Sequence, residues 1–241
     1  MNGTRYDPIA DWYGDWAESS PWVHRVVMQH LPALTAGLHV GSSVLDLGCG
    51  EGTFARILEA DGYRVVGIDC SERLIMLART RSPAAIAFVI DDAQTLDSQP
   101  SGTFDGVICV LALMDIPDLD AVFRAVRRVV HSGGVLSCVV MHPAFDAPGA
   151  SWLDGDIMAA RVVPRYLTEG EWWSGHSAGV RGQVGAWHRS FATYLTTAIG
   201  TGWNLQTIAE WPGLPGEAPN DEIPRLLFMR FVRMNPAPGF E

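Results

Sequence analysis

The strongest constraint on the fold is the run VLDLGCGEG at residues 44–52. It joins a short apolar strand at Val44-Leu45 to a predicted helix that begins at Thr53. The three glycines of the run allow a tight turn and let a ligand approach the backbone closely. The run therefore predicts a strand, a ligand-binding turn and a helix in direct succession, which is a typical start of an α/β fold.

The remainder of the chain alternates between short apolar runs and amphipathic segments. The clearest helix follows Asp118, because apolar residues recur with helical spacing from Leu119 to Val126 and Gly133-Gly134 lie beyond its end. Strands that alternate with helices form right-handed βαβ units and a parallel sheet. Further strands are predicted at residues 63–68, 85–90, 104–111, 135–141, 203–210 and 225–232, and further helices at 53–60, 71–78 and from 190 onward.

Two segments depart from this alternation. Residues 1–40 are predicted to form two helical stretches that cap the fold. Residues 142–189 hold four tryptophans and, after residue 169, five glycines. Because a long irregular segment inside a compact domain is usually functional, we expect it to be a lid or substrate-binding insertion. We find no internal repeat and expect a single domain over residues 1–241.

The composition limits the partners. The net charge is −10 and all 17 basic residues are arginines, so a nucleic-acid partner, which needs clustered basic residues, is not expected. No apolar run approaches the roughly 20 residues that cross a bilayer, and the N-terminus does not resemble a signal peptide. We therefore expect a cytoplasmic protein without membrane contact, either a monomer or a homodimer. The four cysteines are scattered, so we expect neither a metal site nor a disulfide framework.

The glycine spacing separates this turn from that of dinucleotide-binding enzymes. The run reads G-x-G-x-G, whereas the dinucleotide pattern G-x-G-x-x-G would need a glycine or alanine in place of Thr53. The run also carries Asp46 and Glu51, whose negative charge disfavours a pyrophosphate at the helix N-terminus. A zwitterionic, partly cationic ligand suits the turn better.

Two further strands also end in acidic residues. Asp69 ends the second strand, where a carboxylate can accept hydrogen bonds from both hydroxyls of a ribose. Asp91-Asp92-Ala93 ends the third strand, where it suits the amino group and ring edge of an adenine. Ligands of open α/β folds bind outside the carboxyl ends of the strands, so these residues are expected to line one site. Either Asp91 or Asp92 faces the ligand.

With these motifs the chain resembles the class I S-adenosylmethionine-dependent methyltransferases over roughly residues 40–235. Asp46 and the glycines after it match the family's first motif, Asp69 its ribose-binding acid, and Asp92-Ala93 its adenine-binding pair. The resemblance implies a Rossmann-like, doubly wound α/β fold whose seven-stranded, mostly parallel sheet has an antiparallel last strand. It also implies S-adenosylmethionine as cofactor and S-adenosylhomocysteine as product, bound by Tyr13, Asp46, Gly48, Cys49, Gly50, Asp69, Cys70, Asp92, Ala93 and Val110.

The chain is most similar to bacterial small-molecule methyltransferases of types 11 and 25, in a branch whose fifth strand ends in His-Pro. Here that pair is His142-Pro143. His142 is the candidate catalytic base, because methyl transfer often requires an acceptor to lose a proton and a histidine pKa suits this near neutrality. The alternative is a histidine that only fixes the turn before the proline. Candidate substrate-binding residues are Tyr6, Trp173, His176 and His188, with a structural role as the alternative for the two histidines.

The predicted function is methyl transfer from S-adenosylmethionine to an O, N or C atom of a small molecule. A tailoring step in natural-product biosynthesis is the expected setting, because the expected lid is aromatic and the chain is acidic. One alternative is an enzyme of this fold that uses the cofactor structurally, for cyclisation or decarboxylation. Another is a protein that binds the cofactor without catalysis.

Overall fold

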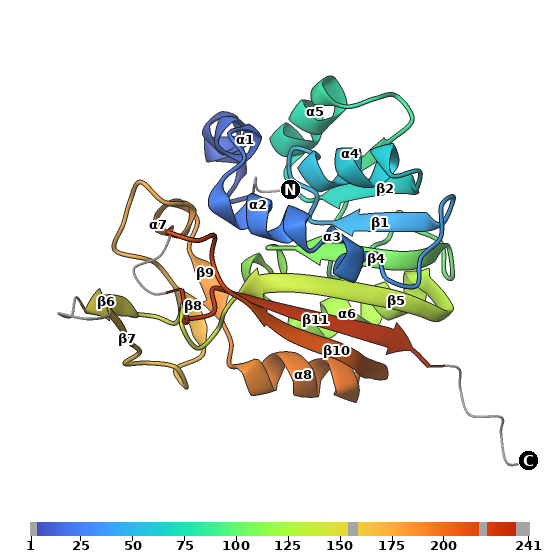
Figure 1. The fold of residues 1–241 in the computed structure, drawn as a ribbon. Coiled ribbons are helices and arrows are strands. Elements are labelled where there is room, and N and C mark those ends of the chain that lie inside the picture. The colour runs from blue at the N-terminus through green and yellow to red at the C-terminus, as the bar shows by residue number, and fades with distance from the viewer. Residues whose placement is uncertain (1–3, 154–158, 217–220, 235–241) are drawn as a thin grey trace, which may run out of the picture.

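The computed structural model describes residues 4–153, 159–216 and 221–234, and its centre is a seven-stranded sheet (Figure 1). Neighbouring strands are parallel except at one strand near the edge, which runs antiparallel to both of its neighbours. That strand is the second in the spatial order β10 (Trp203–Trp211), β11 (Leu226–Arg233), β5 (Val130–Met141), β4 (Phe104–Val110), β1 (Ser43–Leu47), β2 (Arg64–Asp69) and β3 (Ala87–Ile90).

Helices cover both faces of the sheet, and each face has its own apolar core. Leu34, Phe54 and Ile75 belong to one core, and Phe123 and Tyr194 to the other. The helices that contribute to the first core are α2 (Trp22–Gln29), α3 (Leu31–Leu34), α4 (Thr53–Ala60) and α5 (Glu72–Arg81), and those of the second are α6 (Leu119–Val129) and α8 (Phe191–Gly200). This two-sided burial explains why the central strands are apolar on both faces.

The predicted Rossmann-like α/β fold, with its seven-stranded sheet and antiparallel last strand, is confirmed. One strand differs from its prediction, because β5 begins at Val130 and not at residue 135. Val130 pairs with Phe104, and the register of β4 and β5 shifts between that pair and the next. Gly133, with a φ of +81°, lies in this irregular part of the strand. The glycines that end the predicted helix are thus absorbed into the next strand.

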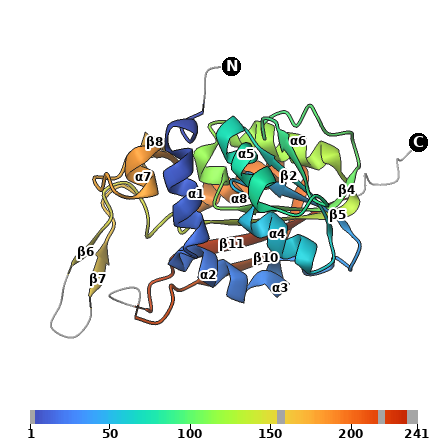
Figure 2. The same cartoon turned by 90° about the horizontal axis from the view of Figure 1, so that it is seen from above.

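The N-terminal segment lies beside the carboxyl ends of the first two strands. Its first described elements are the 3₁₀ turn η1 (Asp7–Ile9) and the helix α1 (Ala10–Glu18). Seen from above, α1 lies next to α5 (Figure 2), and the two helices are in contact. Trp12, Tyr13 and Trp16 all lie on α1.

The described part of residues 142–189, called the insertion from here on, holds more regular structure than the sequence predicts. It forms two antiparallel strand pairs and a one-turn helix, which together satisfy backbone groups that an irregular loop would leave to water. Figure 1 shows it at one end of the sheet, near α1. The elements are the pair β6 (Ser151–Leu153) and β7 (Ala160–Val162), the pair β8 (Gly170–Trp172) and β9 (Ala186–His188), and α7 (Val180–Gln183). Across the described ranges no helix has the length and apolarity needed to cross a membrane.

Candidate functional site

The glycine turn lies between β1 and α4, at the carboxyl end of a central strand. Gly48, Gly50 and Gly52 have φ angles of +71°, +56° and +90°, a backbone conformation that other residues rarely adopt. At Gly48 an added Cβ atom would lie only 2.4 Å from the Cβ atom of Ala112. Glycine is therefore needed here both for the turn and for the close approach of the segment after β4.

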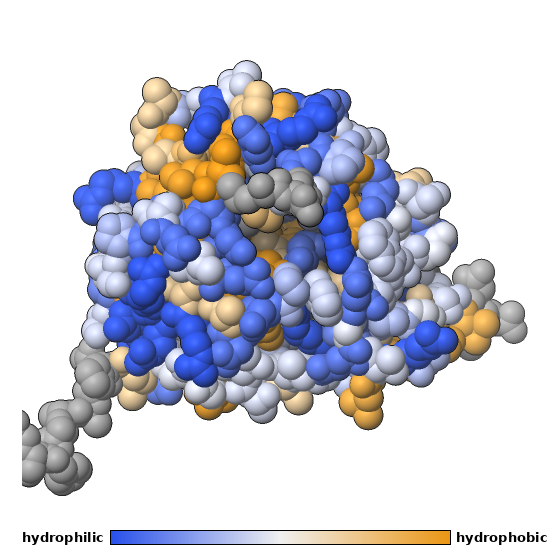
Figure 3. Space-filling model, turned by 180° about the vertical axis from the view of Figure 1, so that it is seen from behind, coloured by the Kyte–Doolittle hydropathy of each residue, from blue (hydrophilic) through white to orange (hydrophobic). Residues whose placement is uncertain are grey.

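A cavity of about 830 Å³ opens beside this turn. In the space-filling view from behind, the molecule is hollowed near its centre, with hydrophobic residues visible in the hollow (Figure 3). The N-terminal segment and the insertion both contribute to the lining. Asp46 and Cys49 are buried and are absent from the lining. The other residues predicted to bind the cofactor all line the cavity, namely Tyr13, Gly48, Gly50, Asp69, Cys70, Asp92, Ala93 and Val110.

Asp69, at the end of β2, is tied to the surrounding backbone through both carboxylate oxygens. Oδ2 accepts a hydrogen bond from the Gly50 N–H at 3.0 Å, and Oδ1 accepts one from the Ser71 N–H at 2.8 Å. Burial raises the pKa of Asp69 to about 6, although these hydrogen bonds favour its charged form. The side chain is thus oriented toward the cavity region and is mostly ionised at neutral pH.

Asp46 lies below the turn with little access to solvent. Its side chain is 2% exposed, and its Oδ2 atom has no hydrogen-bond partner among the described residues. Burial, followed by the nearby charge of Asp69, raises the pKa of Asp46 to about 7. A buried carboxylate with few hydrogen bonds and no ion-pair partner within the described ranges favours a positively charged ligand above the turn.

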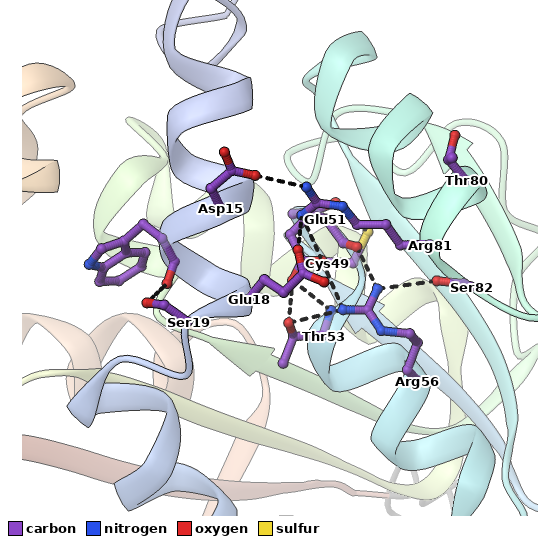
Figure 4. Close-up of polar contacts among 12 residues, drawn as sticks. Asp15, Glu18, Ser19, Cys49, Glu51, Thr53, Arg56, Thr80, Arg81 and Ser82 are labelled. Carbon is purple, nitrogen blue, oxygen red and sulfur yellow. Dashed lines mark hydrogen bonds and ion pairs between the residues drawn. The ribbon is translucent and has the colours of Figure 1, made fainter.

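Glu51 does not present its charge to the cavity, which differs from the role expected of it. Its carboxylate pairs with Arg56 at 2.8 Å and lies 3.8 Å from Arg81, and Figure 4 shows both arginines converging on it. The side chain is 1% exposed and also accepts hydrogen bonds from Thr53. Its charge is neutralised inside the protein. The carboxylates that line the cavity are those of Asp69, Asp91, Asp92, Asp97 and Asp115.

Asp91 and Asp92, between which the sequence does not decide, have different surroundings. Asp91 accepts hydrogen bonds from the N–H groups of Asp92 at 2.8 Å and Ser98 at 2.9 Å, which close the loop after β3. Asp92 is exposed and accepts hydrogen bonds from the backbone and side chain of Gln94. Both residues line the cavity, but the carboxylate of Asp92 is the less engaged in backbone structure.

Two tyrosines of the N-terminal segment cover the cavity. The rings of Tyr6 and Tyr13 meet edge to face with their centroids 5.1 Å apart. An added Cβ atom at Gly50 would lie 3.5 Å from the Tyr13 ring, so this ring lies directly over the glycine turn. Burial raises the pKa of both phenols above the usual tyrosine value, so both remain protonated at neutral pH.

His142 is not among the residues that line the cavity. The ring is 3% exposed; its Nδ1 accepts a hydrogen bond from the Ala144 N–H at 3.2 Å, and its Nε2 lies 2.7 Å from Glu210. Since Nδ1 is an acceptor, the proton of the neutral ring is on Nε2 and is donated to Glu210. Burial lowers the pKa of His142 despite this carboxylate. Nδ1 is thus engaged in the turn after β5 and Nε2 with Glu210 on β10, which is the geometry of the structural alternative.

The predicted substrate-binding residues of the insertion are dispersed. Trp173 is 51% exposed beneath the guanidinium of Arg5, and His176 is exposed, so neither lines the cavity. His188 is buried, and its Nε2 lies 2.8 Å from the carbonyl oxygen of Tyr166. The tryptophan that does line the cavity is Trp187.

One buried cluster at the cavity was not predicted. Asp115 ends the 3₁₀ turn η2 (Leu113–Asp115) after β4, and its carboxylate is bridged by both terminal nitrogens of Arg181 from α7. The hydroxyl of Tyr6 donates to Oδ2 of Asp115 at 3.2 Å. Asp115 and Arg181 are 19% and 16% exposed. Burial raises the pKa of Asp115, and the guanidinium of Arg181 opposes that rise.

A sequence signal exists for only part of this cluster. Asp115 is the first acidic residue after the fourth strand, just as Asp69 and Asp91 mark the ends of the second and third. Arg181 carries no local signal, since it lies 66 residues from its partner in an insertion without periodicity. Leu111, with a φ of +58°, also lines the cavity and is a strained position that no sequence pattern reveals.

Within residues 4–153, 159–216 and 221–234, no three His, Cys, Asp or Glu side chains are grouped so that they could hold a metal ion.

Comparison with known proteins relates this arrangement to a family. The sequence profile of a methyltransferase domain matches residues 45–138. A ubiquinone biosynthesis O-methyltransferase of Pseudomonas aeruginosa is 30% identical over 180 residues, which cover 71% of this chain and 72% of that protein. The crystal structure of an S-adenosylmethionine dependent methyltransferase from Mesorhizobium loti is 30% identical with a TM-score of 0.73, covering 84% of this chain and 96% of that chain.

Some similarities extend over a shorter region. A ubiquinone biosynthesis O-methyltransferase of Xanthomonas oryzae pv. oryzae is 30% identical over 128 residues, or 52% of this chain and 53% of that protein. The chain thus spans about half the length of such curated relatives.

Proposed function

Because the chain belongs to the S-adenosylmethionine-dependent methyltransferases, we propose that it transfers the methyl group of S-adenosylmethionine to a small-molecule acceptor. The observation that carries the proposal is the cavity of about 830 Å³, where the glycine turn, the strand-end acids and an aromatic cover meet. Its volume lies in the range of about 300 to 1,000 Å³ that small-molecule sites occupy.

The residues around the cavity fit the cofactor in charge and shape. The buried carboxylate of Asp46 favours the positive charge of S-adenosylmethionine, and the glycine turn admits a ligand close to the backbone. We assign Asp69 to the ribose hydroxyls and Asp92 with Ala93 to the adenine. Tyr13, which lies over the glycine turn, is assigned to the methionine part.

The acceptor proposed is a phenolic compound of the kind modified in natural-product biosynthesis. Two relatives are ubiquinone biosynthesis O-methyltransferases, which supports a hydroxyl acceptor on a ring. Trp187 of the insertion lines the large cavity, and an aromatic wall of this kind supports a planar acceptor. We propose that the insertion acts as a lid over the acceptor, because it supplies this aromatic wall.

Bound S-adenosylmethionine supplies an electrophilic methyl group on a sulfonium sulfur. The chain orients the acceptor toward that group and excludes water, which together account for much of the acceleration in a displacement of this kind. His142 is not needed as the base, because its two ring nitrogens are engaged outside the cavity lining.

Calorimetric titration of the purified protein with S-adenosylhomocysteine tests the cofactor assignment. We expect saturable binding, and for Asp69→Asn an affinity about 10- to 100-fold weaker, because hydrogen bonds from the ribose would lose their charged acceptor. Asp61→Asn is the matched control, since Asp61 is exposed at the end of α4 and is absent from the cavity lining. Wild-type protein that does not bind S-adenosylhomocysteine would refute the proposed function.

Mass spectrometry with methyl-deuterated S-adenosylmethionine and metabolite extracts tests the reaction. The expected result is a metabolite that gains the heavy methyl group only in the presence of active protein. If the cofactor stays bound and unconsumed while a substrate is rearranged, the cofactor has a structural role. If nothing is converted in any extract, the protein binds the cofactor without methyl transfer.

A further inference from the structure

The Asp115–Arg181 pair lies between two cavities. Asp115 lines the large cavity of about 830 Å³, whereas Arg181 lines a second cavity of about 20 Å³ under the insertion. Trp187 lines both. The small cavity has Met114, Met141 and Trp172 in its walls, together with polar and charged side chains, namely Asp146, His188, Arg189 and Tyr194.

The two halves of the pair are held by different parts of the chain. The loop that carries Asp115 is fixed by the buried Arg189, whose guanidinium donates to the carbonyl oxygens of Leu113, Ile116 and Pro117 at 2.6 to 3.0 Å. Arg181 is on the one-turn helix α7 and also donates to the carbonyl oxygen of Gly185 at 3.1 Å. The aspartate is thus tied to the loop after β4, whereas the arginine belongs to the insertion.

The chain itself provides a phenol at this pair. The hydroxyl of Tyr6 donates a hydrogen bond to Asp115, and Tyr6 lines the large cavity. The tyrosine is attached to the N-terminal segment and not to the sheet, so an incoming phenol can take the place of its hydroxyl. A cavity of about 20 Å³ holds little more than one water molecule, so entry of an aromatic ring also requires the insertion to shift.

We propose that Asp115 and Arg181 form the receptor for the acceptor's phenolic hydroxyl, in which the aspartate accepts the proton and the arginine holds the oxygen as it becomes negative. The acceptor ring then lies against Trp172, Trp187, Met114 and Met141. This inference rests on the proposed methyl transfer and names its acceptor class and its base.

The proposed step is balanced. The acceptor O–H bond breaks and its proton passes to the carboxylate of Asp115, while the oxygen uses an electron pair to form the new bond to the methyl carbon. The bond between sulfur and that carbon breaks, and its electron pair remains on sulfur. The products are an aryl methyl ether, S-adenosylhomocysteine and one proton, which Asp115 returns to solvent.

The test uses 4-nitrophenol, whose phenolate absorbs visible light and so reports its own ionisation without any turnover. The probe is titrated into the full-length protein with and without S-adenosylhomocysteine, at a pH where half of the free probe is ionised. We expect the bound probe to be mostly phenolate. Asp115→Asn should bind the phenolate about tenfold more tightly, because it frees the guanidinium, and Arg181→Gln should bind it at least tenfold more weakly.

Two more variants separate recognition from folding. Arg181→Lys should recover part of the affinity lost in Arg181→Gln, since it restores the charge without the bidentate geometry. Arg165→Gln removes an exposed arginine from the same insertion and should change nothing. A probe that does not bind, or charge changes at residues 115 and 181 that shift its affinity in the same direction, would overturn the inference. Binding of S-adenosylhomocysteine is measured in the same samples. It tests the proposed cofactor site independently of the inference about the phenol.

Discussion

At the scale of single residues, the site is governed by carboxylates that the fold keeps from water. Burial raises the pKa of Asp46 to about 7 and that of Asp69 to about 6. For an acid whose pKa is raised by folding, the folded state holds the proton more tightly than the unfolded state. The contribution to stability is therefore fully present below a pH of about 4 and is lost as the pH rises through 6 and 7.

Asp46→Asn should therefore stabilise the ligand-free protein at alkaline pH. We expect a gain in the free energy of unfolding of roughly 2–4 kcal/mol at pH 8, which becomes small near pH 4, where the aspartate is protonated in the folded state and about half protonated in the unfolded state. Urea denaturation at the two pH values measures this, with the exposed Asp61→Asn as control. An equal or lower stability of Asp46→Asn at pH 8 would show that the buried charge is compensated in the folded protein.

At the scale of elements, α1 is held on α5 by ion pairs of unequal burial. Arg73 pairs with Asp11 at 2.6 Å, but both side chains are more than half exposed. Arg81, which is 22% exposed, pairs with Asp15 at 3.1 Å and lies 3.8 Å from the buried Glu51 of the glycine turn. The second contact therefore connects the N-terminal helix to the ligand-binding turn, as Figure 4 shows.

Arg81→Gln and Arg73→Gln should differ in their effects on stability and on ligand affinity, because the contacts of Arg81 are more buried than those of Arg73. Loss of Arg81 removes charge compensation from the buried Glu51, so we expect a cost of roughly 1–2 kcal/mol in stability and a severalfold weaker affinity for S-adenosylhomocysteine. The exposed Arg73 pair should cost less than about 0.5 kcal/mol and leave the affinity unchanged. Urea denaturation measures the stability of the two variants, and calorimetry measures their affinity for S-adenosylhomocysteine. Equal losses of stability and affinity in both variants would mean that α1 is not connected to the turn through Arg81.

At the scale of the whole molecule, the cavity is covered from two distant parts of the chain. Arg5 pairs with Glu171, donates to the carbonyl oxygen of Val184 at 3.2 Å, and lies over Trp173 with its guanidinium carbon 5.4 Å from the ring centroid. The N-terminal segment and the insertion thus meet over the carboxyl edge of the sheet. A ligand in the cavity contacts both, so its binding should order both together.

Hydrogen exchange can detect this joint ordering. With saturating S-adenosylhomocysteine, amide exchange should slow in residues 6–18 and in residues 180–188, because ligand contacts on either side of the cavity suppress local opening. Exchange in α8, on the far face of the sheet, should stay the same. Protection confined to the glycine turn would show that the two covering segments open independently of the ligand.

The sequence by itself determined the sheet and the floor of the cavity. A strand, a glycine turn and a helix are consecutive in the chain, so VLDLGCGEG specifies them locally. Asp69 and Asp92 follow their strands directly, and parallel strands place their carboxyl ends along one edge. The predicted positions of Gly48, Gly50 and Asp69 beside one cavity follow from these two rules without knowledge of any long-range contact.

Only the tertiary structure decided which side chains from distant parts of the chain meet beside the cavity. Asp115 and Arg181 meet across 66 residues of chain, and no local pattern relates a loop after one strand to a turn in an insertion. The orientation of His142 also depends on packing, because neighbouring residues at a strand end point to opposite faces. Met141 lines the small cavity, so His142 turns toward Glu210 on the neighbouring edge of the sheet. Residue type and spacing were sufficient to place the glycine turn and the strand-end acids at one edge of the sheet, whereas the Asp115–Arg181 pair depends on which distant segments the fold brings together.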